Sequence, residues 1–415
     1  MKILWCTHTL AGFIPEKGSY NGSGWITSLL EEFRKIQNIK IGVAFYLDKN
    51  SKCVIRDGVT FFPIQQGHVD VLSKFKSFLG DYSGWEHEEK LHMARLKEII
   101  HEFSPDIIHV WGTETDMGLI AKEVDIPVII HLQGLLQPYE NMLCPPGISR
   151  FNYICQDGYN PIKIIKNINR LRYWNYKSER ESRIFSECKY YFGRTHWDKA
   201  LSYLFNPKRE YYYCSEMLRP EFYTNDMWTI PHDDVLKIIS TISPPLYKGA
   251  DMIIKTAKIL KNICHINFEW NVIGIEEMKF VEHSTNIKAD EVNVKCLGVK
   301  PAEEIKKIEL NSHIYFHSSY IDNSPNSICE AQMLGMPVIA VNVGGVATIL
   351  NNGRTGWLVP SNEPHIAAIL IATLFHNKVQ LTEKSEATIK ISHKRHDKSC
   401  IIKSLMQCYE MLIQR

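Results

Sequence analysis

The sequence predicts an α/β protein with two mostly parallel sheets in series. Three observations carry this prediction: the length, the composition, and the alternation of short apolar runs with helical patterns. At roughly 100–200 residues per domain, 415 residues fit two domains. The 45% of hydrophobic and 23% of charged residues are ordinary for a globular protein with real cores, and they exclude a disordered or fibrous chain.

Continuous apolar runs bounded by polar stretches are typical of strands that are buried on both faces of a parallel sheet. Spacings of roughly 20–40 residues leave room for a crossover helix between such strands. We expect strands at 3–7, 39–47, 106–111, 128–132, 235–241, 268–274, 292–297, 313–317 and 337–341. The sequence therefore predicts two α/β domains, residues 1–220 and 232–397, joined near 218–234, where two prolines interrupt any periodicity.

Two helices are readable from apolar spacing. Residues 24–36 should bury Trp25, Leu29 and Phe33 on one face. The final segment, 398–415, has apolar residues at helical spacing and could pack on either domain, including the first.

Charge and cysteine content exclude several classes of protein. The net charge of +2 excludes a protein held on nucleic acid by bulk charge. The 11 cysteines form no C-x-x-C pair, which argues against a disulfide framework or zinc ribbon and favours a reducing, cytoplasmic location. No apolar window of about 18 residues is present, so we expect no membrane span.

Familiar catalytic motifs are absent. The sequence has no G-x-S-x-G elbow, no phosphate loop and no D-x-D pair that would chelate a metal, so we expect no metal site. His87 and His92 nearly mimic a zinc helix, but a spacing of five places them on different faces, and this segment is expected to be a solvated helix start.

The loop Gly22-Ser23-Gly24 leaves three interpretations open. It could be a dinucleotide fingerprint, but Thr27 occupies the third glycine position and about 14 residues separate the loop from the first strand, which disfavours NAD. It could be a plain surface loop. It could also cap the helix at 24–36 and offer backbone N–H groups to an anion or a hydroxylated ligand.

The second half carries the strongest functional signal. A Pro-Asn-Ser turn opens a helix after the strand near 314–319, which leaves free N–H groups at Asn326 and Ser327, where a helix dipole favours phosphate. Glu330 lies one to two turns further on, suited to accept hydrogen bonds from ribose hydroxyls. Glycines end two other strands, where backbone can approach a ligand closely: Gly274 and the pair Gly344-Gly345.

These residues resemble glycosyltransferase family 4, the retaining enzymes of the GT-B fold. Asp322 and Glu330 stand at that family's E-x7-E spacing, and Lys248-Gly249 matches its lysine–glycine pair. Further similarity extends over Gly22-Ser23-Gly24, 105–109, the glycine pair and 352–359, so it covers most of the chain and is densest over 240–360. The segment 215–219, reading SEMLR, and the N-S-P-N-S turn are similar to a bacterial surface-polysaccharide subgroup.

The resemblance implies two Rossmann-like domains whose sheets face each other across a cleft, with the acceptor on the first and a UDP- or GDP-linked sugar on the second. It also implies roles: Lys248 for the donor diphosphate, Glu330 for the ribose and Asp322 for the transferred sugar. Three departures stand out. Asp322 replaces a glutamate, Gln133 replaces a histidine before a glycine, and the arginine usually found shortly before the Lys-Gly pair is absent.

The expected function is therefore transfer of a sugar, with retention and without a cofactor, from a nucleotide sugar to a saccharide or lipid-linked acceptor in bacterial polysaccharide biosynthesis. Three alternatives remain: a catalytically silent nucleotide-sugar-binding protein, a GT-B-type epimerase, and an NAD-dependent dehydrogenase. The basic, aromatic segment 163–183 is expected to be a solvated helix. A surface that attaches the protein to the inner face of an anionic membrane is the alternative for this segment.

Overall fold

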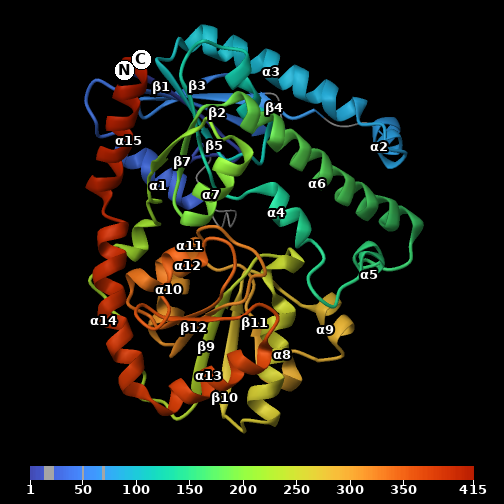
Figure 1. The fold of residues 1–415 in the computed structure, drawn as a ribbon, viewed down its shortest axis with the longest axis vertical. Helices are drawn as coiled ribbons and strands as arrows, with labels where there is room; N and C mark the ends of the chain where they lie inside the picture. Colours follow the sequence, from blue (N-terminus) through green and yellow to red (C-terminus); the bar gives the residue numbers. More distant parts are fainter. Residues whose placement is uncertain (14–22, 49–50, 68–70) are drawn as a thin grey trace.

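The computed structural model describes residues 1–13, 23–48, 51–67 and 71–415 (Figure 1). Gly22 lies outside these residues, so the predicted glycine loop is described only from Ser23 onward, and the side chain of Ser23 is not described. Within the described residues, all strands fall into two sheets, one before residue 214 and one after residue 235.

The first sheet has eight described strands in the order β3-β4-β2-β1-β5-β6-β7-β8. All neighbours are parallel except the β3–β4 hairpin. The bounds are β1 Lys2–Thr7, β2 Lys40–Leu47, β3 Val54–Arg56, β4 Val59–Gln65, β5 Ile107–Trp111, β6 Val128–His131, β7 Tyr190–Gly193 and β8 Glu210–Tyr213.

The second sheet has six described strands, all parallel, in the order β11-β10-β9-β12-β13-β14. Their bounds are β9 Leu236–Thr241, β10 Phe268–Ile273, β11 Val294–Cys296, β12 Ile314–His317, β13 Val338–Val341 and β14 Trp357–Val359. The α/β prediction with two parallel sheets is confirmed, and each of the nine expected strands is present.

Helices surround both sheets. Around the first lie α1 Ser23–Phe33, α2 Val71–Phe78, α3 Ser83–Phe103, α4 Leu136–Asn141, α5 Arg150–Ile154, α6 Pro161–Glu187 and α7 His196–Phe205, with the 3₁₀ turn η1 Asp116–Lys122. A second 3₁₀ turn, η2 Pro220–Phe222, packs against α10 and the core of the second sheet. The remainder are η3 Leu246–Lys248, α8 Ala250–Asn262, α9 Lys279–Thr285, η4 Asp290–Val292, α10 Ala302–Leu310, α11 Asn326–Met333, α12 Val346–Ile349, α13 Pro364–His376, α14 Lys378–Arg395 and α15 Lys398–Ile413. None of the described helices is long and apolar enough to cross a bilayer.

The first sheet has an apolar core on each face, because side chains alternate along a strand. Trp5 points to the face covered by α1, while its neighbour Leu4 points to the face that α3 and α6 cover. The predicted helix at 24–36 is α1, and it buries the expected Trp25, Leu29 and Phe33 against Trp5.

The chain crosses between the two halves twice. After β14 it runs through α13 and α14, and then α15 returns along the first sheet, so that both termini lie at the same end of the molecule (Figure 1). Leu405 and Tyr409 of α15 are fully buried in the core shared with α1. The last helix therefore completes the core of the first half.

Candidate active site

A pocket of about 290 Å³ lies where the carboxyl ends of the two sheets meet. The first half contributes residues that follow β5, β6 and β7, including Glu114, Gln133 and Arg194, and also residues of α4 and α6. The second half contributes Lys248, which follows β9, and Asp322, which follows β12. Since ligands of parallel α/β sheets bind at the carboxyl ends of strands, this is the candidate site.

Lys248 and Asp322, which the sequence predicts as site residues, form an ion pair in this pocket. The Lys248 Nζ lies 2.7 Å from Asp322 Oδ2, and His317 Nε2 lies 3.5 Å from the same oxygen. The other oxygen accepts the Asn323 N–H at 3.1 Å and the Tyr139 hydroxyl at 3.3 Å. Burial alone would raise the pKa of Asp322, but Lys248 and His317 hold it well below its usual range. The surroundings of Asp322 therefore favour its ionised form beside the amino group of Lys248.

Steric crowding explains why a glycine follows Lys248. Gly249 has φ +77°, and a Cβ there would lie 2.0 Å from the Ser318 carbonyl oxygen. Only glycine lets η3 approach the end of β12 so closely. The Lys-Gly pair thus places the ammonium group beside the Asp322 loop.

The first turn of α11 faces the pocket through Asn326. Pro325 caps the helix, and the first N–H groups of a helix have no intrahelical acceptor. The buried Oδ1 of Asn326 has no hydrogen-bond partner among the described residues. The free N–H groups and the helix dipole suit an anion, whereas Asn326 Oδ1 can accept a hydrogen bond from a ligand hydroxyl. Ser327 is the next residue of this turn but is not among the described residues that line the pocket.

Glu330 is paired with an arginine that sequence reasoning missed. Both of its oxygens accept hydrogen bonds from Arg219, each at 2.7 Å, and the Glu330 side chain is buried. Arg219 follows the last strand of the first sheet, within the SEMLR segment. Gly24 makes room for it, because a Cβ at Gly24 would lie 2.8 Å from Arg219 Cγ. The glycine loop and Glu330 therefore meet through Arg219.

Of the predicted glycines, Gly344 and Gly345 lie behind the loop that carries Asp322. Gly344 has φ +51°, a Cβ there would lie 2.0 Å from the Asp322 carbonyl oxygen, and the Gly345 N–H donates to that oxygen at 3.0 Å. The pair thus supports the Asp322 loop from behind. Gly274 follows β10 with φ +101°, and its N–H donates to Gly298. Among the described residues that line the pocket, none is one of these three glycines.

Gln133 lies on the opposite wall of the pocket. Its buried side-chain Nε2 has no hydrogen-bond partner among the residues that the structure describes. Its main-chain carbonyl oxygen accepts a hydrogen bond from Asn323 Nδ2 at 2.8 Å. Tyr139 and Glu114 line the same wall, and neither was singled out from the sequence. The Glu114 carboxylate accepts the Gly134 N–H at 3.1 Å.

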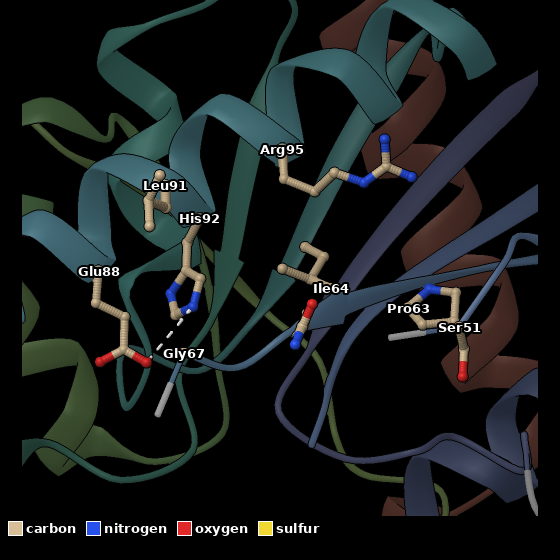
Figure 2. A pocket seen from close by; sticks show the side chains of 9 residues that line it. Ser51, Pro63, Ile64, Gly67, Glu88, Leu91, His92 and Arg95 are labelled. Atoms are coloured by element: carbon tan, nitrogen blue, oxygen red, sulfur yellow. Dashed lines mark ion pairs between the residues drawn. The ribbon is translucent and has the colours of Figure 1, made fainter. Parts of the chain in front are cut away.

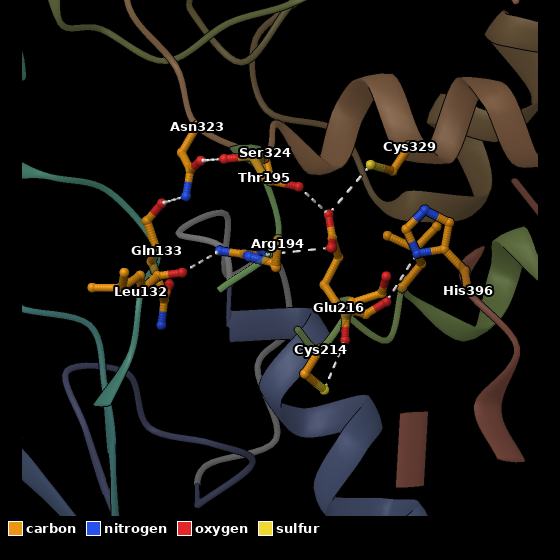
Figure 3. A network of polar contacts seen from close by, with 12 residues as sticks. Leu132, Gln133, Arg194, Thr195, Cys214, Glu216, Asn323, Ser324, Cys329 and His396 are labelled. Carbon is orange, nitrogen blue, oxygen red and sulfur yellow. Dashed lines mark hydrogen bonds and ion pairs between the residues drawn. The ribbon is translucent and has the colours of Figure 1, made fainter. Parts of the chain in front are cut away.

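A buried polar network joins the two halves directly behind Asp322 (Figure 3). Asn323 donates to Gln133 and to Asp198, and its Oδ1 accepts the Thr195 hydroxyl at 2.6 Å. Ser324 donates to Glu216 Oε1 at 2.5 Å. Burial would raise the pKa of Glu216, but Arg194 and His396 lower it to about 2. Asn323 and Ser324, which follow Asp322 directly, are thus fixed by groups of the first half.

Two sequence expectations about helices are wrong in part. The segment at 87–92 is no solvated helix start, because it lies inside α3 and buries Glu89 and His92. The segment 163–183 is no uniformly solvated helix either, because α6 buries Tyr176 and Arg180. In both helices the face turned toward the sheet carries polar side chains that pair with one another, which apolar periodicity cannot detect.

His92 lines a second pocket, of about 350 Å³, that belongs wholly to the first half (Figure 2). Its Nδ1 lies 2.8 Å from Asp116 Oδ2, and its Nε2 lies 3.8 Å from Glu88 Oε1. Burial would lower the pKa of His92, but Asp116 and Glu88 raise it above its ordinary value. No group of three or more His, Cys, Asp or Glu side chains suited to hold a metal ion occurs in the described part of the chain.

Comparison with known proteins gives a family for part of the chain and a fold for all of it. Residues 232–395 match the family model of the glycosyl transferases group 1. The amylovoran biosynthesis glycosyltransferase AmsK of Erwinia amylovora is 28% identical over 144 residues, which cover 33% of this chain and 35% of AmsK. The putative colanic acid biosynthesis glycosyltransferase WcaL of Escherichia coli K12 is 25% identical over 145 residues, with 33% and 35% covered.

Solved structures match along the whole chain. Sucrose-phosphate synthase from Thermosynechococcus elongatus has a TM-score of 0.74 at 12% identity, with 100% of both chains covered. HepE of Anabaena, in complex with UDP and glucose, has a TM-score of 0.66 at 13% identity, with 99% of this chain and 100% of HepE covered. At such identities the likeness shows the fold alone. Residues 232–395 therefore form a glycosyl transferases group 1 domain, within a chain that has the two-domain GT-B fold.

Proposed function

We propose that this protein transfers a sugar from a nucleotide-diphosphate sugar, linked to UDP or GDP, to a saccharide or lipid-linked acceptor in bacterial polysaccharide biosynthesis. The observation that carries the proposal is the Lys248–Asp322 pair beside the first turn of α11, in the pocket between the two sheets. The second half would hold the donor and the first half the acceptor.

The residues of the pocket suit the charges of this reaction. A nucleoside diphosphate leaves as an anion, and an ammonium group together with helix N–H groups stabilises the negative charge that develops on it. Lys248 and the N–H groups near Asn326 would supply these contacts. The ionised Asp322 would bind hydroxyls of the transferred sugar and stabilise positive charge at its anomeric carbon. We propose retention of configuration and assign no side-chain nucleophile.

Glu330 would bind the ribose once Arg219 shares or releases its carboxylate. Both oxygens accept from Arg219 in the structure, so donor binding and the Arg219 contact compete for the same atoms. Asn326 and Ser327, at the start of the same helix, would lie on the phosphate side of the nucleotide. Gly344 and Gly345 would act by holding the Asp322 loop in place.

The comparisons support the pathway part of the proposal. The matched relatives AmsK and WcaL are named for the biosynthesis of amylovoran and colanic acid. HepE was solved with UDP-glucose as well as with UDP and glucose. We propose the same donor chemistry for this chain, acting in the cytoplasm on an acceptor at the inner face of the cell membrane.

A thermal-shift panel tests donor binding. The wild type, Lys248→Ala and Lys258→Ala are each heated with UDP, GDP, ADP or NAD; Lys258 is the control, an exposed lysine of α8. A ligand at about 100 times its Kd adds about 2.7 kcal/mol of stability. We expect UDP or GDP to raise the Tm of the wild type and the control but not of Lys248→Ala. A shift with NAD alone, or an undiminished shift in Lys248→Ala, would contradict the proposal.

A further inference from the structure

A third pocket, of about 560 Å³, lies between α4, α5 and α6. Two arginines, Arg150 and Arg172, line it, against a single acid, Glu140. Arg172 donates to the Ser77 carbonyl oxygen at 2.8 Å, and Glu140 accepts from Asn175 at 3.3 Å. Arg150 is exposed, and among the described residues no hydrogen-bond acceptor for it is found. The pocket is therefore polar, net positive and supplied with one uncommitted guanidinium group, which suits an anion.

This pocket adjoins the candidate active site along two helices. On α4, Tyr139 lines the active-site pocket and the next residue, Glu140, lines the third pocket. On α6, Trp174 lines the active-site pocket and the next residue, Asn175, lines the third pocket. Because consecutive side chains of a helix point about 100° apart, the two pockets lie on different faces of the same two helices, α4 and α6.

Exposed apolar side chains lie on the segments next to Arg150. Arg150 is followed directly by Phe151, which is 63% exposed. Tyr159, which precedes α6, is 78% exposed, and Ile162, in the first turn of α6, is 77% exposed. The two stretches are held together, because Asn167 of α6 donates to the Ile154 carbonyl oxygen at 3.0 Å. We call Phe151, Tyr159 and Ile162 the apolar tip. Three large apolar side chains exposed this strongly on neighbouring segments indicate contact with something apolar.

A single ligand explains all three features. It needs a hydroxylated end at Asp322, an anionic middle at Arg150 and an apolar end at the tip. A saccharide linked through phosphate or diphosphate to a lipid has these groups in that order. The lipid would lie in a membrane against the tip, where aromatic side chains suit the interface.

We propose that the third pocket binds the phosphate or diphosphate of a lipid-linked acceptor, with Arg150 as its main ligand and the apolar tip against the lipid. The inference rests on the proposed function and names its acceptor class. Arg172 and Glu140 complete the pocket, and the saccharide extends past Tyr139 toward Asp322.

The test measures binding of three probes by calorimetry: farnesyl diphosphate, farnesol and inorganic pyrophosphate. Saturating UDP is present throughout to occupy the donor's diphosphate site. We expect the wild type to bind farnesyl diphosphate more tightly than either other probe. Arg150→Gln should weaken its binding by at least roughly fivefold, because a charge-assisted hydrogen bond is lost. The matched control Lys166→Gln removes an exposed charge of α6 outside the pocket and should leave binding unchanged.

The apolar tip is tested separately with the triple variant Phe151→Ala, Tyr159→Ala and Ile162→Ala. It should bind farnesyl diphosphate no better than pyrophosphate, whereas Ile366→Ala with Ile369→Ala, on exposed sites of α13, should behave as wild type. Equal binding by Arg150→Gln and wild type overturns the anion site. Equal binding of pyrophosphate and farnesyl diphosphate by the wild type overturns the lipid assignment and leaves a site for a free anion.

UDP binding by the same variants keeps the two proposals apart. Arg150→Gln should bind UDP as tightly as wild type does, because Arg150 does not line the donor side of the active-site pocket. If the wild type does not bind UDP but its binding of farnesyl diphosphate still depends on Arg150, the donor proposal is wrong and the acceptor inference is supported. If UDP binds and Arg150 has no effect, only the acceptor inference is wrong.

Discussion

Lys248 and Asp322 lie 74 residues apart in sequence and form the central charge pair of the site. The Asp322 side chain is 9% exposed and that of Lys248 21%. A buried carboxylate is tolerated because a cation and hydrogen-bond donors surround it. The same pairing holds Lys248 in the pocket where the proposed reaction would release a diphosphate.

We expect Lys248→Ala to lower sugar transfer by at least roughly tenfold, because the leaving diphosphate loses its cation. It should also destabilise the fold by about 1–3 kcal/mol, less than for a fully buried pair because Lys248 keeps some exposure. Initial rates and urea denaturation measure these effects. The double variant Lys248→Ala, Asp322→Asn should regain part of the stability but none of the activity. A double variant no more stable than the single one would show that Asp322 is not stabilised by Lys248.

Glu181 is another buried carboxylate. It binds the first turn of α4, the helix that carries Tyr139 and directly follows the Gln133 loop. It accepts the N–H groups of Leu136 at 3.0 Å and Gln137 at 3.2 Å, as well as the Thr113 hydroxyl. Burial raises its pKa from 4.5 to about 7, against these hydrogen bonds, which lower it.

Stability should therefore depend on pH through Glu181. Below about pH 4.5 both folded and unfolded states hold the proton; as pH rises toward 7 only the unfolded state releases it, so stability is lost over this window. Between pH 5 and 8 the wild type should lose roughly 2–3 kcal/mol more than Glu181→Gln, at about 1.36 kcal/mol per pKa unit. Urea denaturation of both proteins at the two pH values measures this difference. Parallel curves would mean that Glu181 is ionised throughout.

At the scale of elements, the loop between β12 and α11 is shaped by the first half of the molecule. Asn323 and Ser324 bind Gln133, Thr195, Asp198 and Glu216, and Gly344 supports the loop from behind. The loop that carries Asp322 is therefore held from both sides, by Lys248 and Gly345 of the second half and by groups of the first half that bind the two residues after it.

Asn323→Ala should lower kcat by roughly tenfold while Kd for UDP changes by less than about twofold, because it frees the loop without touching the donor's ligands. Thr195→Val, which removes one hydroxyl at the same contact, should act in the same direction. The effects of the two variants should not add, since they break one interaction.

Steady-state kinetics and calorimetry provide the readouts. Tyr211→Phe is the control, because its hydroxyl binds Asp198 at 2.6 Å from within the first half. Equal losses in kcat and UDP affinity for Asn323→Ala would point to unfolding of the donor site instead.

At the scale of the whole molecule, the chain's last helix belongs to its first core. Leu405 of α15 is fully buried beside Trp5 and Phe33, and the Tyr409 hydroxyl contacts His109 Nδ1. Two chain connections therefore join the halves. One lies near Arg219, before the second sheet, and the other lies near His396, after it.

Leu405→Ala should destabilise the first half by about 2–4 kcal/mol through the cavity it leaves. Ile413→Ala, on the same helix but 38% exposed, should change stability by less than about 0.5 kcal/mol. Scanning calorimetry with and without UDP measures both. We expect the Leu405→Ala protein to unfold at a lower temperature and still gain stability from UDP, because the donor's ligands lie in the second half. Equal effects of the two substitutions would mean that α15 does not share this core.

By itself, the sequence determined the α/β class, the two sheets and the nine expected strands. These features follow from periodicity and turn residues, which are local, whereas Lys248 and Asp322 were predicted from the resemblance to glycosyltransferase family 4. Five strands escaped that reasoning: β3, β4, β7, β8 and β14. Pro63 lies inside β4 and argues against a strand, while β7 and β8 are short, tyrosine-rich and lack apolar alternation.

Only the tertiary structure decided which charges meet. Glu330 binds Arg219, Asn323 binds Thr195 and Asp198, and Arg150 lies on a pocket between helices that the sequence left unassigned. Glu89 and His92 are buried in the structure, although the charged residues of their helix had predicted that they are exposed to solvent. The physical reason is that periodicity reports which face of an element is apolar, whereas the partner of a buried charge depends on which distant segments the fold brings together.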